Sequence, residues 1–231
     1  GVAVGTVSLP VLSKAFKNKN IKKLTNIQSK SFELSLLLSI PASLGLILAS
    51  EEIVNALFGY GTFSKGDVKL TADALKYFGY GVPAFALVKI LSNFFFARDN
   101  TKTPFYISIV IVVINISISV SLFPTFGFII IPIATSLATW AGVLIYIYLL
   151  NKKKSLLLKI ELIPNLIKIL SSTIIMSFIL VLALNNYASY LNYTYKFKAI
   201  YLISIVGFVG VVYLLSCYLL GILKIKNYKT N

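Results

Sequence analysis

Residues 89–104 read KILSNFFFARDNTKTP, which places a short polar segment between two long apolar runs. Arg98, Asp99 and Lys102 supply the charges of this segment, and the flanking runs cover residues 70–96 and 103–123. A helix needs about 20 mostly apolar residues to cross a bilayer. The stretch therefore predicts one turn of a polytopic membrane protein, with a spanning helix on each side of it.

The composition of the whole chain agrees with this class. Hydrophobic residues make up 58% of the 231 residues, charged residues only 13%, and the mean hydropathy is +0.87. The apolar residues form six blocks of near-bilayer length, at 32–50, 70–96, 103–123, 128–150, 162–184 and 199–223. A further apolar piece, 1–10, is too short to cross and lacks an initiator Met. We expect an all-α fragment that begins inside a helix and continues through six full spans.

The basic residues follow the loops in an alternating pattern. Most of the 22 lie in the first, third and fifth loops and in the tail: Lys14, Lys17, Lys19, Lys22, Lys23 and Lys30; Arg98 and Lys102; Lys152, Lys153, Lys154 and Lys159; Lys224, Lys226 and Lys229. The intervening loops hold only Lys65, Lys69, Lys196 and Lys198. The positive-inside rule then predicts a multi-pass protein with a cytoplasmic C-terminus. Anionic membrane lipids explain the net charge of +15 without a nucleic-acid partner.

Residues that usually carry catalysis or bind metals are scarce. The chain has no His, and its one Cys, Cys217, lies in the middle of a predicted span, where we expect a small apolar residue. There is no GxxxxGK[ST] phosphate-binding loop. We therefore expect that the chain binds no metal, uses no cofactor and is not an enzyme. Pro and Gly recur inside the spans, where they serve close helix packing or bending during transport.

Two polar groups inside the spans are candidates for lining a substrate cavity. Lys89 lies within a span, with Ser92 and Asn93 three and four residues further on; it either faces a cavity or extends toward the headgroups. Ser108, Asn115 and Ser119 share a face of the next span, where hydrogen bonds between helices are the default and cavity lining is the alternative. We select Lys89, Asn93 and Asn115.

The polar hairpin is the second candidate, as a cytoplasmic gate or hinge. Thr103 followed by Pro104 suits the N-cap and first position of a helix. Arg98 and Asp99 can pair with each other or with neighbouring loops. The hairpin candidates are Arg98, Asp99, Asn100, Thr101, Lys102, Thr103 and Pro104.

Several blocks of the chain resemble one family. FFFARDNTKTP at 94–104, YGVPAFALVK at 80–89, LFGYGTFSKGD at 57–67 and the opening GVAVGTVSLPVLSKAF are similar, in order and spacing, to the C-terminal half of the MurJ (MviN) lipid II flippases. The match extends from Gly1 to about Leu150. The family commonly has Asp directly before TKTP, whereas this chain has Asn100 there and Asp99 one position earlier.

The resemblance implies a 14-helix flippase of the multidrug/oligosaccharidyl-lipid/polysaccharide exporter superfamily, in the bacterial cytoplasmic membrane. Residues 1–150 would supply most of its second lobe, and 151–231 a basic connector and the terminal helix pair, with a groove for a polyprenyl tail. The implied substrate is lipid II, flipped for peptidoglycan synthesis by alternating access, with coupling to the membrane potential or a monovalent cation. The missing N-terminal half would be the partner and would hold the principal substrate-binding charges.

Two other functions fit the same observations. A related exporter of another lipid-linked sugar, or a cation-coupled drug antiporter, would share the fold. A membrane scaffold without transport would need no cavity, and the Pro, Gly and polar residues inside the spans argue against it.

Overall fold

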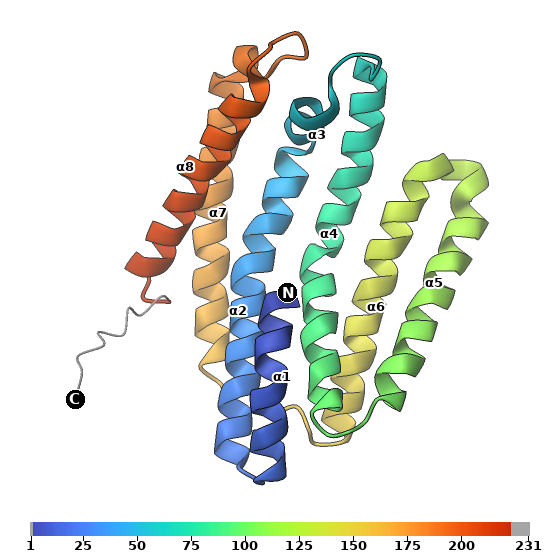
Figure 1. Ribbon diagram of the computed structural model, residues 1–231, viewed down its shortest axis with the longest axis vertical. Helices are drawn as coiled ribbons and strands as arrows, with labels where there is room; N and C mark the ends of the chain where they lie inside the picture. The colour runs from blue at the N-terminus through green and yellow to red at the C-terminus, as the bar shows by residue number, and fades with distance from the viewer. Residues whose placement is uncertain (1, 223–231) are drawn as a thin grey trace.

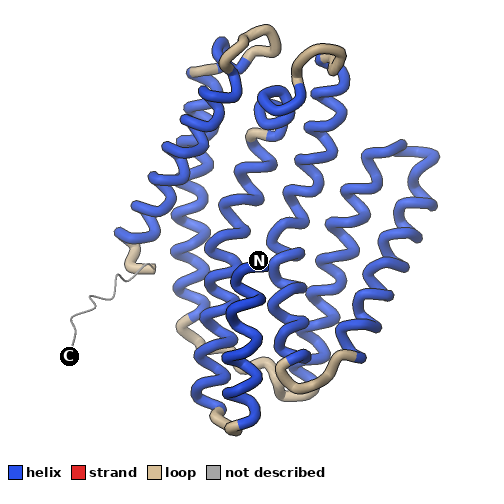
Figure 2. Tube along the Cα trace, in the orientation of Figure 1, coloured by secondary structure: helices blue, strands red, loops and turns tan. Residues whose placement is uncertain are grey.

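The computed structural model describes the backbone of residues 2–222 and the side chains of residues 8–222. That part of the chain is helical and contains no strand (Figure 2). Its helices are α1 Val2–Lys17, α2 Ile21–Leu48, α3 Ser50–Phe58, α4 Lys65–Phe96, α5 Lys102–Phe126, α6 Ile130–Lys152, α7 Leu162–Asn186 and α8 Lys198–Leu219, with short 3-10 turns η1 Gly127–Ile129 and η2 Ala188–Leu191.

Local sequence explains where several helices begin and end. Asn20 accepts a hydrogen bond from the Lys23 backbone N–H (2.9 Å) and so caps α2. Ser64 and Asp67 form a capping box at the start of α4. Gly127, at φ +63°, ends α5 in the left-handed region that glycine adopts without steric cost.

The long helices stand side by side in a row. The order across Figure 1 is α8, α7, α2, α4, α6 and α5, and each helix packs against the next. α1 lies in front of this row and contacts α2 and α4. Because α4 touches α1, α2, α3, α5 and α6, it is the centre of the packing.

The largest hydrophobic core surrounds the second half of α4. Ile90, Leu91 and Phe94 on α4 are fully buried there, and Tyr146 of α6 packs its ring 5.8 Å from that of Phe95. A second core joins α7 and α8 and includes Cys217, which is buried among apolar side chains as predicted. The terminal helix pair therefore has its own core, and α7 attaches that pair to α2.

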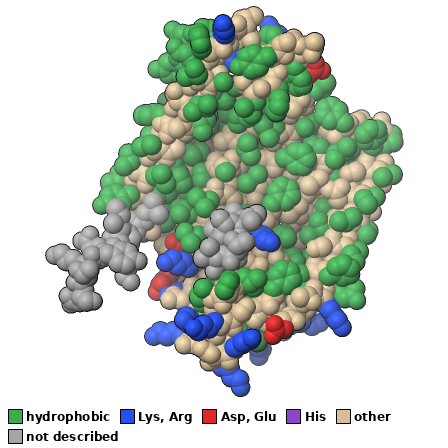
Figure 3. All heavy atoms as spheres, viewed as in Figure 1, with side chains coloured by type: hydrophobic (Ala, Val, Ile, Leu, Met, Phe, Trp, Pro, Cys, Tyr) green, Lys and Arg blue, Asp and Glu red, His purple; other side chains and the backbone are tan. Residues whose placement is uncertain are grey.

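Charge separates the two ends of the molecule. The α1–α2 turn, the α4–α5 hairpin and the α6–α7 connector lie at the lower end in Figure 1, and Lys and Arg side chains gather at that end in Figure 3. We call it the basic end. The α2–α3–α4, α5–α6 and α7–α8 connections lie at the opposite end, which we call the outer end.

Five stretches of the described residues are long and apolar enough to cross a membrane. The longest, Lys102–Lys152, contains both α5 and α6, which pack against each other after the chain turns at η1. Two helices extend further toward the basic end than the predicted apolar runs. The first helix continues past residue 10 to Lys17, and α2 begins at Ile21 rather than at residue 32. Leu223 and the tail lysines Lys224, Lys226 and Lys229 lie outside the described residues.

Candidate functional site

Lys89 lies on the exposed side of α4, while its predicted companions are buried. Ser92 and Asn93 are 7% and 3% exposed, and Ser92 Oγ donates a hydrogen bond to the Lys89 carbonyl (2.9 Å). Side chains three and four positions along a helix lie on either side of the first, about 60° and 40° around the axis. The predicted polar stripe is therefore split between the surface and the core, and only its Lys89 edge is accessible.

Asn115 joins two neighbouring helices. Its Nδ2 donates to Thr135 Oγ1 of α6 (2.8 Å), and Ser119 Oγ lies 3.4 Å from its Oδ1. Ser108 instead bonds to the Pro104 carbonyl within α5 (2.9 Å). The default expectation of hydrogen bonding between helices is thus confirmed for Asn115, and this contact holds the α5–α6 hairpin together.

Arg98 connects the hairpin to two other segments. Its Nη2 donates to the Ser155 carbonyl in the α6–α7 connector (2.9 Å), and its Nη1 donates to the Phe94 carbonyl. The guanidinium also lies 5.3 Å from the centroid of the Phe16 ring on α1. Partial burial lowers the pKa of Arg98 below its ordinary value, although an arginine stays charged at neutral pH. The hairpin is therefore fastened to its neighbours through Arg98, not paired with Asp99.

The connector is held from the other side by α2. Gln28 is fully buried; its Nε2 donates to the Ser155 carbonyl (3.3 Å) and its Oε1 accepts from the Leu157 N–H (2.8 Å). Ser29 Oγ accepts from the Lys159 N–H (2.8 Å). Arg98, Gln28, Ser29 and the connector backbone form what we call the basic-end network.

The start of α5 differs from the prediction. The helix begins at Lys102, and Asn100 supplies the capping oxygen, because its Oδ1 accepts from the Thr103 N–H (3.1 Å). The assignment of Thr103 as N-cap was therefore wrong. Asp99 adopts φ +55° in the turn before it, a conformation that Asp tolerates better than most residues. Thr101 and Lys102 are exposed, and Pro104 is buried in the first turn.

A buried lysine joins α8 to α3 at the outer end. Lys198 is fully buried, and its Nζ donates to Asn55 Oδ1 (3.0 Å) and to the carbonyls of Gly59 (2.6 Å) and Tyr193 (2.9 Å). The ammonium also lies 4.2 Å from the centroid of the Tyr60 ring. Asn55 Nδ2 in turn donates to the Leu191 carbonyl (2.7 Å). We call this arrangement the Lys198 clasp.

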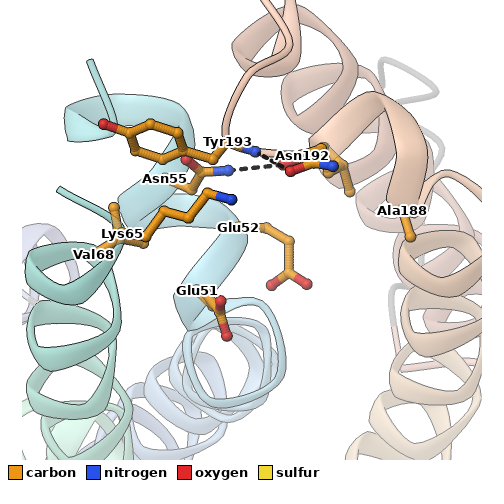
Figure 4. Close-up of a pocket in the computed structure, with 9 residues that line it drawn as sticks. Glu51, Glu52, Asn55, Lys65, Val68, Ala188, Asn192 and Tyr193 are labelled. Carbon is orange, nitrogen blue, oxygen red and sulfur yellow. Dashed lines mark hydrogen bonds between the residues drawn. The ribbon is translucent and has the colours of Figure 1, made fainter. Parts of the chain in front are cut away.

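A polar pocket of about 280 Å³ opens beside the clasp. It lies between α3, the start of α4 and the α7–α8 connection, and Asn55 and Tyr193 meet at its edge (Figure 4). Glu51, Glu52 and Lys65 supply its charges. Partial burial raises the pKa of the Glu52 carboxyl above its ordinary value. Among the described residues, no group of three or more His, Cys, Asp or Glu side chains could hold a metal ion.

An apolar groove of about 570 Å³ runs between α7 and α8. Ala183, Ile205 and Phe208 line it, and Tyr187 and Tyr201 close its outer end. The Tyr201 ring stacks on Tyr190 at 4.7 Å between centroids, within a larger group of tyrosines. The predicted cluster of tyrosines at this boundary is thus present, and it stands at one end of an apolar groove.

Three comparisons with known proteins bear on these observations. The family model described as lipid II flippase MurJ matches residues 1–204. The chain belongs to this family. A probable lipid II flippase MurJ of Rickettsia prowazekii is 33% identical over 231 residues, which cover 98% of this chain and 45% of the relative. A Rhizobium tropici protein of the same description is 37% identical over 140 residues, 61% of this chain and 26% of its own length.

A solved structure shares the fold. It is titled lipid II flippase MurJ, inward closed conformation, and it matches with a TM-score of 0.74 at 27% identity, over 94% of this chain and 42% of its own. The chain thus spans about 45% of the length of the first of these MurJ relatives. The resemblance inferred from the sequence is confirmed at the level of family and fold.

Proposed function

We propose that the protein containing this chain flips lipid II across the bacterial cytoplasmic membrane, as a transporter without catalytic chemistry. The observation that most strongly supports this proposal is the MurJ match over residues 1–204, together with a shared fold over 94% of the chain. In this proposal the chain crosses the membrane six times, with α5 and α6 as separate spans. The basic end and the C-terminus face the cytoplasm, in keeping with the positive-inside rule.

The geometry suggests a role for each part within that function. Residues 1–150 would form most of the second lobe, and residues 151–231 the connector and terminal pair. The α7–α8 groove has the apolar lining that a polyprenyl tail requires. Of the three cavity candidates, Lys89 is the accessible one and would serve the anionic headgroup, while the buried Asn93 on α4 and the bonded Asn115 on α5 would support the helices around it. Coupling would use the membrane potential or a monovalent cation.

The hairpin 98–104 remains our candidate for a cytoplasmic gate or hinge. Since Arg98 is bonded to the connector and packs against Phe16, the hairpin would move together with the connector and the end of α1. Alternating access requires two packings of the same elements that differ by only a few kcal/mol. The basic-end network is the set of contacts that such a motion would have to keep or exchange.

Complementation tests the function directly. The complete protein is expressed in a bacterium depleted of its own lipid II flippase, and growth is scored together with exposure of lipid II on the outer face. Rescue with exposure supports the proposal. Stable membrane expression without rescue would overturn it and favour an exporter of another lipid-linked sugar or a drug antiporter.

Lys89→Ala should reduce lipid II exposure about tenfold in that assay, because a cation in a cavity concentrates an anionic substrate. Lys76→Ala is the matched control, since Lys76 is also an exposed lysine of α4 but lies toward the outer end. If Lys89→Ala retains full exposure at equal expression, Lys89 does not line the cavity.

A further inference from the structure

A cavity of about 620 Å³ lies near the basic end, between α2, the start of α7 and the end of α8. Lys30, Glu33 and Leu37 of α2 line one side, and Glu161 and Lys168 line the other, on and just before α7. A smaller cavity of about 170 Å³ adjoins it, shares Lys30, Glu33 and Glu161, and adds Lys159. We call the two together the α2–α7 cavity. None of the contacts described above for the hairpin, the clasp or the groove uses its charged side chains.

The charges of the larger cavity balance. It holds two lysines and two glutamates, although this end of the molecule is otherwise strongly basic. The smaller cavity adds Lys159, which already pairs with Glu161. Figure 3 shows acidic and basic side chains mixed along one edge of this face, above the Lys-rich end. A cavity that collected anions would be expected to lack carboxylates, since like charge repels a phosphate. The presence of lysines and glutamates in one cavity therefore favours a ligand that carries both a negative and a positive charge.

Each carboxylate of the cavity has one partner on the protein: a hydrogen bond for Glu33 and an ion pair for Glu161. Asn165 Nδ2 donates to Glu33 Oε2 (3.0 Å), which fixes the carboxylate between α2 and α7. Lys159 Nζ lies 3.9 Å from Glu161 Oε2, and the Glu161 side chain remains 82% exposed. A carboxylate has about four lone-pair sites, so both glutamates can accept further N–H donors.

Apolar side chains continue from the charged part of the cavity. Leu34 and Leu37 of α2 line the same space within about two helical turns of Lys30 and Glu33, and Ile222, three residues past the end of α8, lines it from the other side. A ligand with a charged head and a hydrocarbon tail matches this change from polar to apolar lining. Phospholipid headgroups also lie at the depth in the membrane where a spanning helix ends.

We propose that the α2–α7 cavity binds the headgroup of a zwitterionic phospholipid that carries a primary ammonium, of the ethanolamine type. Lys30 and Lys168 would attract its phosphate, and Glu33 and Glu161 would accept from its ammonium. An anionic glycerol headgroup would bring no ammonium to the two carboxylates, and a choline headgroup has no N–H to donate. This binding is separate from the flipping of lipid II and does not depend on it.

Native mass spectrometry of the complete purified protein tests the proposal, with phosphatidylethanolamine, phosphatidylglycerol and phosphatidylcholine supplied in equal amounts. Retention of the ethanolamine lipid should exceed that of each other lipid about fivefold, as expected for one additional exposed charge pair. In the double variant Glu33→Gln, Glu161→Gln, this preference should disappear and retention of phosphatidylglycerol should rise. The amide oxygen that Glu33→Gln introduces can still accept from Asn165, so the packing of α2 on α7 is kept.

Two further variants separate the cavity from general charge effects. Lys168→Gln should weaken retention of both phosphatidylethanolamine and phosphatidylglycerol, whereas Lys22→Gln, an exposed lysine of α2 outside the cavity, should change neither. Equal retention of all three lipids by the unaltered protein would overturn the proposal. So would an unchanged preference in the Glu33→Gln, Glu161→Gln double variant, when its thermal unfolding matches that of the unaltered protein.

Discussion

Lys198→Met is expected to lower the free energy of unfolding by about 3 kcal/mol, because it leaves three buried oxygens without their donor. These are Asn55 Oδ1 and the carbonyls of Gly59 and Tyr193, all within 3.0 Å of the ammonium. Methionine keeps the length of the stem but cannot donate a hydrogen bond. Thermal unfolding of the complete protein in detergent, followed by circular dichroism, should show a melting temperature lowered by several degrees.

Lys196→Met is the matched control for this change. Lys196 lies two residues earlier in the same connection and is exposed, so its loss should leave the melting temperature unchanged. Gly59→Ala provides an independent route to the same contact, since an added Cβ would lie 2.6 Å from the Asn55 carbonyl oxygen and 3.1 Å from Lys198 Nζ. Equal melting temperatures for Lys198→Met and Lys196→Met would show that the clasp contributes no stability.

No local signal distinguishes Lys198 from Lys196 in the sequence. Both fall in a short stretch of sequence between two apolar runs and were counted among the sparse charges of the intervening loops. The acceptors of Lys198 on α3 and just after it are 143 and 139 residues away along the chain. A buried lysine is recognisable only when its partners are known, and those depend on how α8 is placed against α3.

The apolar runs, by contrast, were sufficient to place most helices. Each predicted block from 70–96 to 199–223 overlaps a helix, and the polar turn at 98–101 separates α4 from α5 as expected. The length of an apolar run is a local property of the sequence, so spanning helices can be predicted without knowing how the chain folds. Gln28 shows the limit: it lies between lysines in a segment predicted as a basic loop, yet it is fully buried in α2.

Among the polar candidates too, some contacts could be predicted from the sequence and others could not. The pairing of Asn115 with a neighbouring helix follows from residue type and depth, and it is present. The environment of Arg98 does not follow from its neighbours in sequence, because its partner Ser155 lies 57 residues further on. Local pattern identified the turn, while the contacts that fasten the turn come from the α6–α7 connector.

Gln28→Leu is expected to release that connector from α2. Leucine occupies a similar space but cannot accept from the Leu157 N–H or donate to the Ser155 carbonyl, at a cost of about 2 kcal/mol. Lys153, Lys154 and Lys159 lie in the connector and Lys152 ends α6, and all four are trypsin sites. Cleavage there should become about 30-fold faster, because proteolysis follows the population of the open form when reclosing is fast.

The rate of tryptic cleavage is measured on the complete protein in detergent, with the cut sites assigned by mass spectrometry. Asn26→Leu is the control, since Asn26 is an exposed residue of α2 near the same end. Gln28→Glu should fall between the two, because a carboxylate still accepts from the Leu157 N–H, while the Ser155 carbonyl retains the hydrogen bond from Arg98. If Gln28→Leu and Asn26→Leu are cleaved at the same rate, Arg98 and Ser29 are sufficient to hold the connector. The hairpin would then hold the connector through Arg98 and α2 would hold it through Ser29, so a hinge motion of residues 98–104 would have to carry the connector with it or break its bond to Arg98.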